Sequence, residues 1–415
     1  MGDRVNMISH YNGSEMNIRA ERSIAHGALT NSKRPSAFVR GVYPTHIRRG
    51  HGSILFDVDG NRYIDTVCGL GTNLFGYGNP QIGEAVARAM QSGGSVFSLG
   101  TDLEVEVAET LRGTFPFLER LRFLKTGSEG CAAAVRIARA FTGRYEIASE
   151  GYHGWSDQFV SLTPPANGVT DDHKIWPLGP MYDELLCEGR AAAVIVEPVI
   201  TDISDERRRF IQQLRDDCTK SGILLIFDET ISAYRFPNYC VARHWNILPD
   251  LWIGGKAIAG GLPLSVVGGR ADVMESDYFV SSTWAGDRLA LAAAQVADGL
   301  VHGPFNPSDL WLYGQEFQEK FNAVSPSVQA AGYPTRGVWK FATEMHKALW
   351  MQEMCKAGVL VGPSWFYTKY IHSELENLLS IHKAIIKNIE EGRCRVEGDP
   401  PHSPFAERVR HDEKT

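Results

Sequence analysis

Residues 191–227 decide the fold. They include AAAVIVE at 191–197, RRRFIQQLRDDCTK at 207–220 and GILLIF at 222–227. The first and third segments are continuous apolar runs, which are typical of strands buried on both faces. The segment between them has the apolar spacing of an amphipathic helix. A strand, a helix and a second strand in this order form a parallel pair joined by a crossover. The sequence therefore predicts an α/β fold with a mainly parallel sheet that is covered by helices.

The same alternation of strands and helices extends over residues 80–285. Helical periods run through IGEAVARAMQ (82–91), LEVEVAETLRG (103–113) and GCAAAVRIARAF (130–141), and RFLK (122–125) is a short strand. Ahead of them, SILFDVDGNRYIDTV (53–67) is typical of a β-hairpin that turns at Asp59-Gly60. We expect most of these segments to form one large α/β domain.

Beyond about residue 300, the pattern changes to that of a smaller α+β domain. VWKFATEM (338–345) is predicted as a strand, and MQEMCKAG (351–358) and SELENLLSIHKAIIKNIEEG (373–392) as helices. We expect four parts along the chain. They are a segment at 1–60 that packs on the small domain and the pocket, the large domain at 61–295, the small domain at 296–394, and a tail at 395–415 that is mobile unless a partner subunit holds it.

Composition narrows the class of protein. The 415 residues carry 42 Lys and Arg against 49 Asp and Glu, and this net charge of −7 disfavours a nucleic-acid partner. The seven cysteines are an odd number without a CxxC pair, so we predict no disulfide framework and no metal site. No apolar stretch is long enough for a membrane helix, and the first residues lack a secretory signal. We expect a cytoplasmic protein with no membrane partner.

Two polar motifs follow predicted strands, at the sheet edge where open α/β folds bind ligands. Gly127 and Ser128 begin a helix whose free amides suit one phosphate, although such residues also form ordinary turns and helix caps. Asp228 comes directly after a buried run, where a carboxylate costs stability unless it is paired with a cation or several donors. Taken by itself, Asp228 could also cap a helix.

Two further segments place a lysine and two aromatic residues among glycines. Lys256, in IGGKAIAGG (253–261), has small apolar neighbours and no acidic one, which suits a Schiff-base lysine. A phosphate loop is excluded because no Ser or Thr follows the lysine and the GxxxxGK spacing is absent. Tyr152 and His153 lie between two glycines, where they could stack on a flat cofactor or form a structured loop.

The four motifs together indicate one cofactor. Pyridoxal 5'-phosphate needs a lysine for its aldehyde, a carboxylate that keeps its pyridine nitrogen protonated, and anchors for its phosphate and ring. We therefore expect a pyridoxal phosphate site at the edge of the predicted sheet.

At these residues the sequence resembles the class III (ω-type) aminotransferases of the fold type I pyridoxal phosphate enzymes, in particular the glutamate-1-semialdehyde aminomutase-like branch. The likeness runs from about Val42 to His372. Besides the hairpin, its markers are FLKTGSEGCAAAVRIAR, GYHGW, AAVIVEPV, ILLIFDETISAYRF, PDLWIGGKAIAGGLPLSVVGGR and STWAGDRLALAAA. The resemblance implies a large cofactor-binding domain, a smaller α+β domain and transaminase activity.

Individual roles follow from the same resemblance. It implies that Lys256 forms the Schiff base and moves a proton at the substrate, and that Asp228 pairs with the pyridinium nitrogen. The other implied cofactor contacts are Gly127 and Ser128 at the phosphate, Tyr152 and Ile231 on the two ring faces, Glu197 near the ring, and Thr283 at the phosphate of a neighbouring subunit. The active site would therefore be shared within a homodimer.

The sequence departs from the family pattern at three places. Lys125-Thr126 replaces the usual Asn-Ser, and Asp287-Arg288 replaces the usual Asn-Pro. Aminomutases resemble one another in a long gating loop, and the corresponding interval here, 274–282, is shorter. Without that loop little would hold a diamine intermediate in place, so the resemblance favours a two-substrate transaminase.

Candidate substrate residues lie in several segments. An amino donor such as L-glutamate needs a cation for its carboxylate, and Arg34, Arg40 and Arg336 are candidates, as well as ordinary surface arginines. Asp202, Asp205 and Glu206 would suit a polyhydroxylated or cationic acceptor, unless the arginines that follow neutralise them. The segment 33–60 also resembles branch members that aminate sugar-derived aldehydes in antibiotic and polysaccharide pathways. We therefore predict an oxidised sugar or aminoglycoside-type carbonyl as acceptor.

Three other functions remain open. A glutamate-1-semialdehyde aminomutase is the nearest alternative to the transaminase. An inactive homologue that only binds pyridoxal phosphate is disfavoured because Lys256, Asp228 and a phosphate motif are all present. A nicotinamide-dependent dehydrogenase would rest on CGLGTNLFGYG (68–78), which lacks the GxGxxG spacing and does not follow a buried strand.

Overall fold

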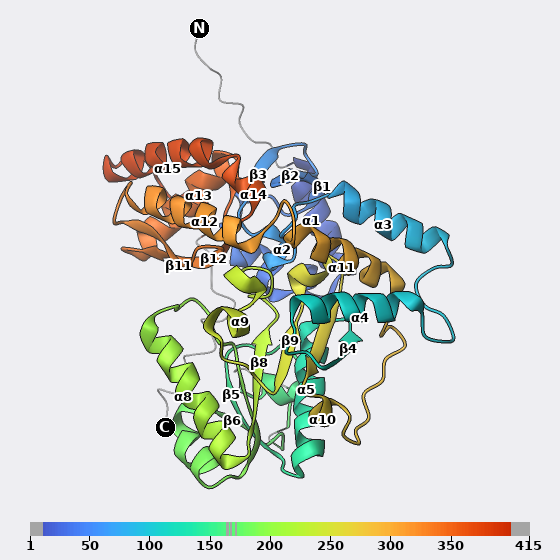
Figure 1. The fold of residues 1–415 in the computed structure, drawn as a ribbon. Helices are drawn as coiled ribbons and strands as arrows, with labels where there is room; N and C mark the ends of the chain where they lie inside the picture. The colour runs from blue at the N-terminus through green and yellow to red at the C-terminus, as the bar shows by residue number, and fades with distance from the viewer. Residues whose placement is uncertain (1–10, 163–165, 167, 171, 400–415) are drawn as a thin grey trace. The chain divides into compact units, whose positions relative to one another are not determined.

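The computed structural model describes residues 11–162, 166, 168–170 and 172–399 (Figure 1). The chain forms two compact units. The first comprises the residues up to Leu70, Gly76–Asn79 and the residues from Leu312 onward, and the second comprises Gly71–Phe75 and Pro80–Trp311. Among the described residues, no helix has the length and apolar content that crossing a membrane requires.

The second unit is built on a seven-stranded sheet in the order β4-β10-β9-β8-β7-β5-β6. The strands are β4 (Arg120–Leu124), β5 (Glu146–Glu150), β6 (Ile175–Pro177), β7 (Ala191–Val196), β8 (Leu224–Glu229), β9 (Leu251–Gly254) and β10 (Ser265–Gly269). Only β10 runs antiparallel to its neighbours, β4 and β9. All residues of β7 and β8 are buried, as their apolar runs predict. The predicted α/β fold with a mainly parallel sheet is confirmed.

Helices surround this sheet (Figure 1). The longer ones are α3 (Pro80–Gln91), α4 (Asp102–Thr114), α5 (Gly127–Thr142), α8 (Asp205–Ser221) and α11 (Arg288–Val301). The short ones are α6 (Asp157–Val160), α7 (Leu178–Tyr182), η4 (Asp183–Cys187), η5 (Pro237–Tyr239), α9 (Val241–Trp245), η6 (Lys256–Ala259) and α10 (Ala271–Met274). The buried side of α5 consists of small and branched apolar residues, so the helix packs closely on β7, β9 and β10.

The first unit contains two small sheets, in the orders β1-β2-β3-β13 and β11-β12-β14. Their strands are β1 (Ile47–His51), β2 (Ile54–Asp57), β3 (Arg62–Asp65), β13 (Val359–Leu360), β11 (Val328–Tyr333), β12 (Arg336–Phe341) and β14 (Ser364–Phe366). The predicted hairpin is present, because β2 pairs antiparallel with β3. Tyr43 ties the N-terminal segment to the C-terminal one, since its hydroxyl donates to the carbonyls of Met351 (3.1 Å) and Val361 (3.0 Å).

The remaining helices lie near the two ends of the chain. They are α1 (Tyr11–Ser23), η1 (Ala25–Gly27), η2 (Asn31–Lys33), η3 (Pro35–Ala37), α2 (Cys68–Gly71), α12 (Pro307–Asn322), α13 (Glu344–Lys356), α14 (Lys369–His372) and α15 (Leu375–Glu390). The sequence did not predict α1, because its polar residues give no clear apolar period. The strand predicted to reach residue 345 ends at Phe341 instead, since Thr343 caps α13 by accepting from His346 N.

The unit limits differ from the expected domain limits at 60 and 295. β3 pairs with β2 and β13, so residues 61–70 belong to the first unit. Helix α11 packs on α3 and continues past residue 295, so residues 296–311 stay with the second unit. The start of the expected tail, 395–399, is hydrogen-bonded within the first unit, with Glu397 N donating to Gln352 Oε1 at 2.8 Å. The rest of that tail, 400–415, lies outside the described residues.

Candidate active site

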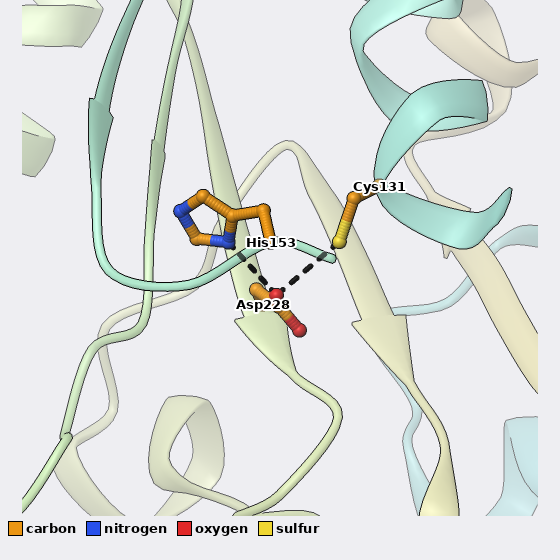
Figure 2. A group of neighbouring side chains, drawn as sticks. All are labelled: Cys131, His153 and Asp228. Carbon is orange, nitrogen blue, oxygen red and sulfur yellow. Dashed lines mark hydrogen bonds and ion pairs between the residues drawn. The ribbon is translucent and has the colours of Figure 1, made fainter. Parts of the chain in front are cut away.

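Asp228 is the centre of a buried polar cluster at the end of β8 (Figure 2). Its Oδ2 lies 2.8 Å from His153 Nδ1 and accepts from the Cys131 thiol at 3.2 Å. Its Oδ1 accepts from the Thr230 amide at 3.1 Å and from the Thr230 hydroxyl at 2.6 Å. These contacts are the several donors that a buried carboxylate requires.

His153 joins Asp228 to the end of β5. Its Nδ1 lies 2.8 Å from Asp228 Oδ2, and its Nε2 lies 3.1 Å from the carbonyl oxygen of Glu150. The side chains of His153 and Asp228 are only 1% and 4% exposed, so the contact between them is buried.

The electrostatics of the cluster keep Asp228 ionised. Burial raises the pKa of Asp228, but the hydrogen bond and charge of His153 and the bonds from Thr230 outweigh burial and hold this pKa below its ordinary value. Burial and the neighbouring Asp228 carboxylate raise the pKa of the Cys131 thiol, so the sulfur keeps its hydrogen. A protonated pyridine nitrogen beside Asp228 would find a permanent negative charge.

The start of α5 forms the proposed phosphate cradle. Thr126 is the N-cap, and its side chain and that of Glu129 bond each other's backbone amides in a capping box. Gly127 and Ser128 follow in the first turn, where backbone amides have no partner within the helix. Ser128 Oγ also accepts from the Trp155 amide at 3.3 Å, which joins the cradle to the loop after β5.

Lys256 is the first residue of η6 and is separated from the end of β9 by Gly255 alone. Its backbone φ is +47°, a left-handed conformation that a residue with a side chain adopts only at a cost. Such strain is often stored where a side chain must be aimed at a functional site. The structure therefore places Lys256 at the same sheet edge as Asp228, because β8 and β9 are parallel neighbours.

Thr230 contacts all three motifs, a role that its sequence context does not predict. A Cβ at Gly127 would lie 2.9 Å from Thr230 Cγ2, and a Cβ at Gly255 would lie 3.0 Å from the same atom. The Thr230 side chain thus touches the residue before Lys256 and the start of α5, while its hydroxyl bonds Asp228. Both glycines are needed for this close approach.

The other expected cofactor contacts differ in their burial. Glu197 is 7% exposed and accepts from the Tyr152 amide at 2.9 Å, so it holds the loop that carries Tyr152. The Tyr152 side chain is 57% exposed. Ile231 is half-buried beyond β8, and Thr283 is exposed in the turn before α11.

The candidate substrate residues are divided between the units. Arg34 lies between η2 and η3, Arg40 pairs its backbone with Asp399, and Arg336 is buried in β12, all in the first unit. In the second unit, Asp202 Oδ1 accepts from the Ser204 amide at 2.8 Å, which suits a turn before α8. Asp205 and Glu206 occupy the first turn of α8, where carboxylates stabilise a helix start.

Gly154 offers a test of the cradle. Its φ is +95°, and a Cβ there would lie 2.1 Å from Ser128 Oγ and 2.7 Å from Ser128 Cα. We expect Gly154→Ala to weaken cofactor binding at least about tenfold, because the loop must move away from Ser128. Equilibrium titration of the cofactor-free protein measures this change.

The matched control for Gly154→Ala is Gly60→Ala in the hairpin turn. Gly60 has a similar φ of +89°, but a Cβ there would meet nothing within 4 Å. The control variant should lose about 1–2 kcal/mol of stability from backbone strain alone and bind the cofactor normally. Equal cofactor affinities for the two variants would show that Ser128 does not line the phosphate site.

These residues suit pyridoxal phosphate by their chemistry. An ionised, buried carboxylate can keep a pyridine nitrogen protonated, a glycine-rich helix start can hold a phosphate, and a lysine at the same edge can hold an aldehyde. The fold and the site thus define the class of protein, an α/β enzyme built for this cofactor.

The comparison with known families gives the narrower identity. The model of the family described as aminotransferase class-III matches residues 37–300, which is more than half of the chain. The chain belongs to the class-III aminotransferase family. It is a transaminase, and its cofactor is pyridoxal 5'-phosphate.

Individual relatives agree with this family. A glutamate-1-semialdehyde 2,1-aminomutase from Symbiobacterium thermophilum is 36% identical over 302 residues, which cover 66% of this chain and 70% of the relative. A glutamate-1-semialdehyde 2,1-aminomutase from Desulforamulus reducens is 31% identical over 409 residues, which cover 88% of this chain and 94% of the relative. The solved structure of the FumI protein from Sphingopyxis sp. MTA144, with pyridoxal phosphate bound, matches with a TM-score of 0.81. The match is 24% identical in sequence and covers 94% of this chain and 98% of the FumI chain. At that identity the structural likeness shows the fold alone.

Proposed function

We propose that this chain is a two-substrate aminotransferase, which moves an amino group from an amino acid donor, such as L-glutamate, to the carbonyl of a second substrate. The observation that carries this proposal is the loop between α10 and α11. It is short, and its backbone is fixed to the second unit: Arg136 donates to the carbonyl of Phe279 and Arg122 to that of Val280, each at 2.8 Å. A loop tied down in this way is poorly suited to gate the site.

The tasks of the residues follow from their positions. When bound, the cofactor supplies a covalent handle for the amino group and an electron sink. Asp228, with His153 behind it, holds a negative charge at the expected ring nitrogen. We expect Lys256 to move a proton at the α carbon of the substrate. We expect Gly127 and Ser128 to hold the phosphate.

A homodimer is part of the proposal. Large apolar side chains are exposed in two segments of the second unit: Phe97 (52%), Leu99 (84%), Phe279 (78%) and Trp284 (52%). Single exposed apolar residues are common, but four of them in these two segments favour a covering partner. Thr283 is exposed in the same segment, and we propose that it reaches the phosphate of the second subunit.

The acceptor class that we propose is an oxidised sugar or aminoglycoside-type carbonyl. Asp202, Asp205 and Glu206 support it, because all three are exposed and the Arg207 guanidinium pairs with Glu150, at 2.8 Å. A polyhydroxylated or cationic acceptor could bind to these exposed carboxylates. Their positions in a turn and at a helix start agree equally with a structural role.

A glutamate-1-semialdehyde 2,1-aminomutase is the second candidate, and the names of the relatives favour it. An aminomutase exchanges amino groups within one molecule, whereas a transaminase needs a separate acceptor. The requirement for an acceptor therefore distinguishes the two proposals.

The experiment supplies L-glutamate to the cofactor-loaded protein and follows 2-oxoglutarate. We expect about one equivalent per site from glutamate alone, and continued release only when a carbonyl acceptor is added. The panel of acceptors should include oxidised aminosugars, keto acids and simple aldehydes, with glutamate-1-semialdehyde tested separately. Sustained conversion of glutamate-1-semialdehyde without any acceptor would replace the proposal by the second candidate.

A further inference from the structure

Two departures from the family pattern, Lys125 and Asp287, meet in the folded chain. Lys125 Nζ lies 2.5 Å from Asp287 Oδ2, and the two side chains are 17% and 11% exposed. They are 162 residues apart in the sequence, so the contact joins the end of β4 to the residue before α11. The two charged side chains thus form one largely buried ion pair.

Asp287 is anchored independently of this pair. Its Oδ1 accepts from the Ser95 hydroxyl at 2.5 Å and from the Leu289 amide at 3.1 Å, which caps α11. Burial raises the pKa of Asp287, but the bonds from Lys125, Ser95 and Leu289 outweigh it and hold this pKa below its ordinary value. Asp287 is therefore a fixed anion at the base of the loop that carries Thr283.

Lys125 is joined just as closely to the phosphate cradle. Its backbone amide donates to Glu129 Oε2 at 2.7 Å, and the next residue, Thr126, is the N-cap of α5. The first turn with Gly127 and Ser128 follows at once. Any shift of Lys125 would thus move the start of α5.

We propose that Lys125 and Asp287 are a pair of positioning residues that fix the start of α5 for the cofactor phosphate and hold the loop of Thr283 against it. The proposal rests on the proposed placing of the phosphate at Gly127 and Ser128. The pair also balances charge: Lys125 neutralises Asp287, which would otherwise present an uncompensated anion close to a doubly charged phosphate.

This arrangement predicts effects of different size for the two single variants. Lys125→Met leaves Asp287 as an unpaired anion, so the dissociation constant of pyridoxal phosphate should rise about thirtyfold. Asp287→Asn leaves Lys125 free to attract the phosphate, so the constant should change by less than about threefold. The double variant should bind more tightly than Lys125→Met alone, and Lys125→Arg should bind like the unaltered protein.

The experiment titrates each cofactor-free protein with pyridoxal phosphate by absorbance and fluorescence, without any substrate. Thermal unfolding of the cofactor-free proteins confirms that each variant folds, and Lys125→Gln replaces Lys125→Met if the methionine variant does not. The control is Glu275→Gln, which breaks the pair of Arg120 and Glu275 (2.8 Å, side chains 54% and 60% exposed) between β4 and the same loop. Such an exposed pair should leave the constant unchanged.

Two results would overturn the inference. One is a dissociation constant for Lys125→Met no different from that of Glu275→Gln. The other is strictly additive effects in the double variant, since residues that act as a pair must be coupled. Because cofactor binding is measured without turnover, a failed acceptor screen would leave this test intact.

Discussion

Replacement of Lys256 by alanine is expected to reduce transaminase turnover by a factor of about 10⁴ or more. Lys256 lies two residues after the end of β9, with a φ of +47° that only a few residue types adopt readily. Alanine keeps the backbone but removes the amine that binds the cofactor and moves the proton. Turnover is measured with L-glutamate and the acceptor that the panel identifies.

Two controls separate chemistry from folding in the Lys256→Ala variant. Lys340→Ala removes an exposed amine from β12 and should leave turnover unchanged. Small primary amines added to Lys256→Ala should restore part of the proton transfer, because they replace the missing base. A Lys256→Ala protein that keeps normal turnover would exclude Lys256 from catalysis.

Asp228→Asn is expected to lower turnover about 10²- to 10³-fold, which corresponds to about 3–4 kcal/mol of lost electrostatic stabilisation. Asparagine can still accept hydrogen bonds, but it carries no charge for His153 or for a pyridinium nitrogen. Cofactor affinity should fall by less than about tenfold, since the phosphate and the lysine remain. Steady-state kinetics and cofactor titration measure the two effects.

Glu229→Gln is the matched control for Asp228→Asn. Glu229 is the next residue of β8 and is fully buried, with Oε2 accepting from Val241 N (2.7 Å) and Ser232 Oγ (2.8 Å), and Oε1 from Ala242 N (2.9 Å). These hydrogen bonds stabilise the fold, so Glu229→Gln should lower the free energy of unfolding by about 1–3 kcal/mol. Its turnover should change little. Equal losses of turnover in both variants would show that Asp228 acts only as a structural carboxylate.

The pH dependence of Asp228 follows from the direction of its pKa. The folded protein holds this pKa below the ordinary value, so ionisation of Asp228 stabilises the fold above that value and the contribution is lost as the pH falls through the lowered pKa. Between pH 5 and 9 Asp228 stays ionised. Any loss of turnover in that range must come from other groups.

The core of the fold could be predicted from the sequence because its signals are local. The apolar runs that form β7 and β8 are buried throughout, and the helix between them spans Asp205–Ser221. The helix α1 could not be predicted in this way, since few apolar residues mark its buried side. A pattern of periodicity reports only helices with a clear apolar face.

The site was predictable in its motifs but not in its connections. Lys256 and Ser128 lie at the starts of helices and Asp228 lies at the end of a strand, and this order is visible in the sequence. The roles of Thr230 and His153 depend on which side chains the fold brings within hydrogen-bond distance of Asp228. The pairing of Lys125 with Asp287 crosses 162 residues of sequence, so the two substitutions were recognised only as separate departures.

One measurement tests the central claim most directly: reduction of the cofactor-loaded protein with borohydride, followed by mass spectrometry of its peptides. Reduction makes the bond between the cofactor and its lysine permanent, so the labelled peptide identifies that lysine. The account predicts the label on Lys256, and it predicts none on Lys125, which the ion pair with Asp287 holds. A label on Lys125 or any other lysine, with Lys256 unmodified, would contradict the assignment of this site.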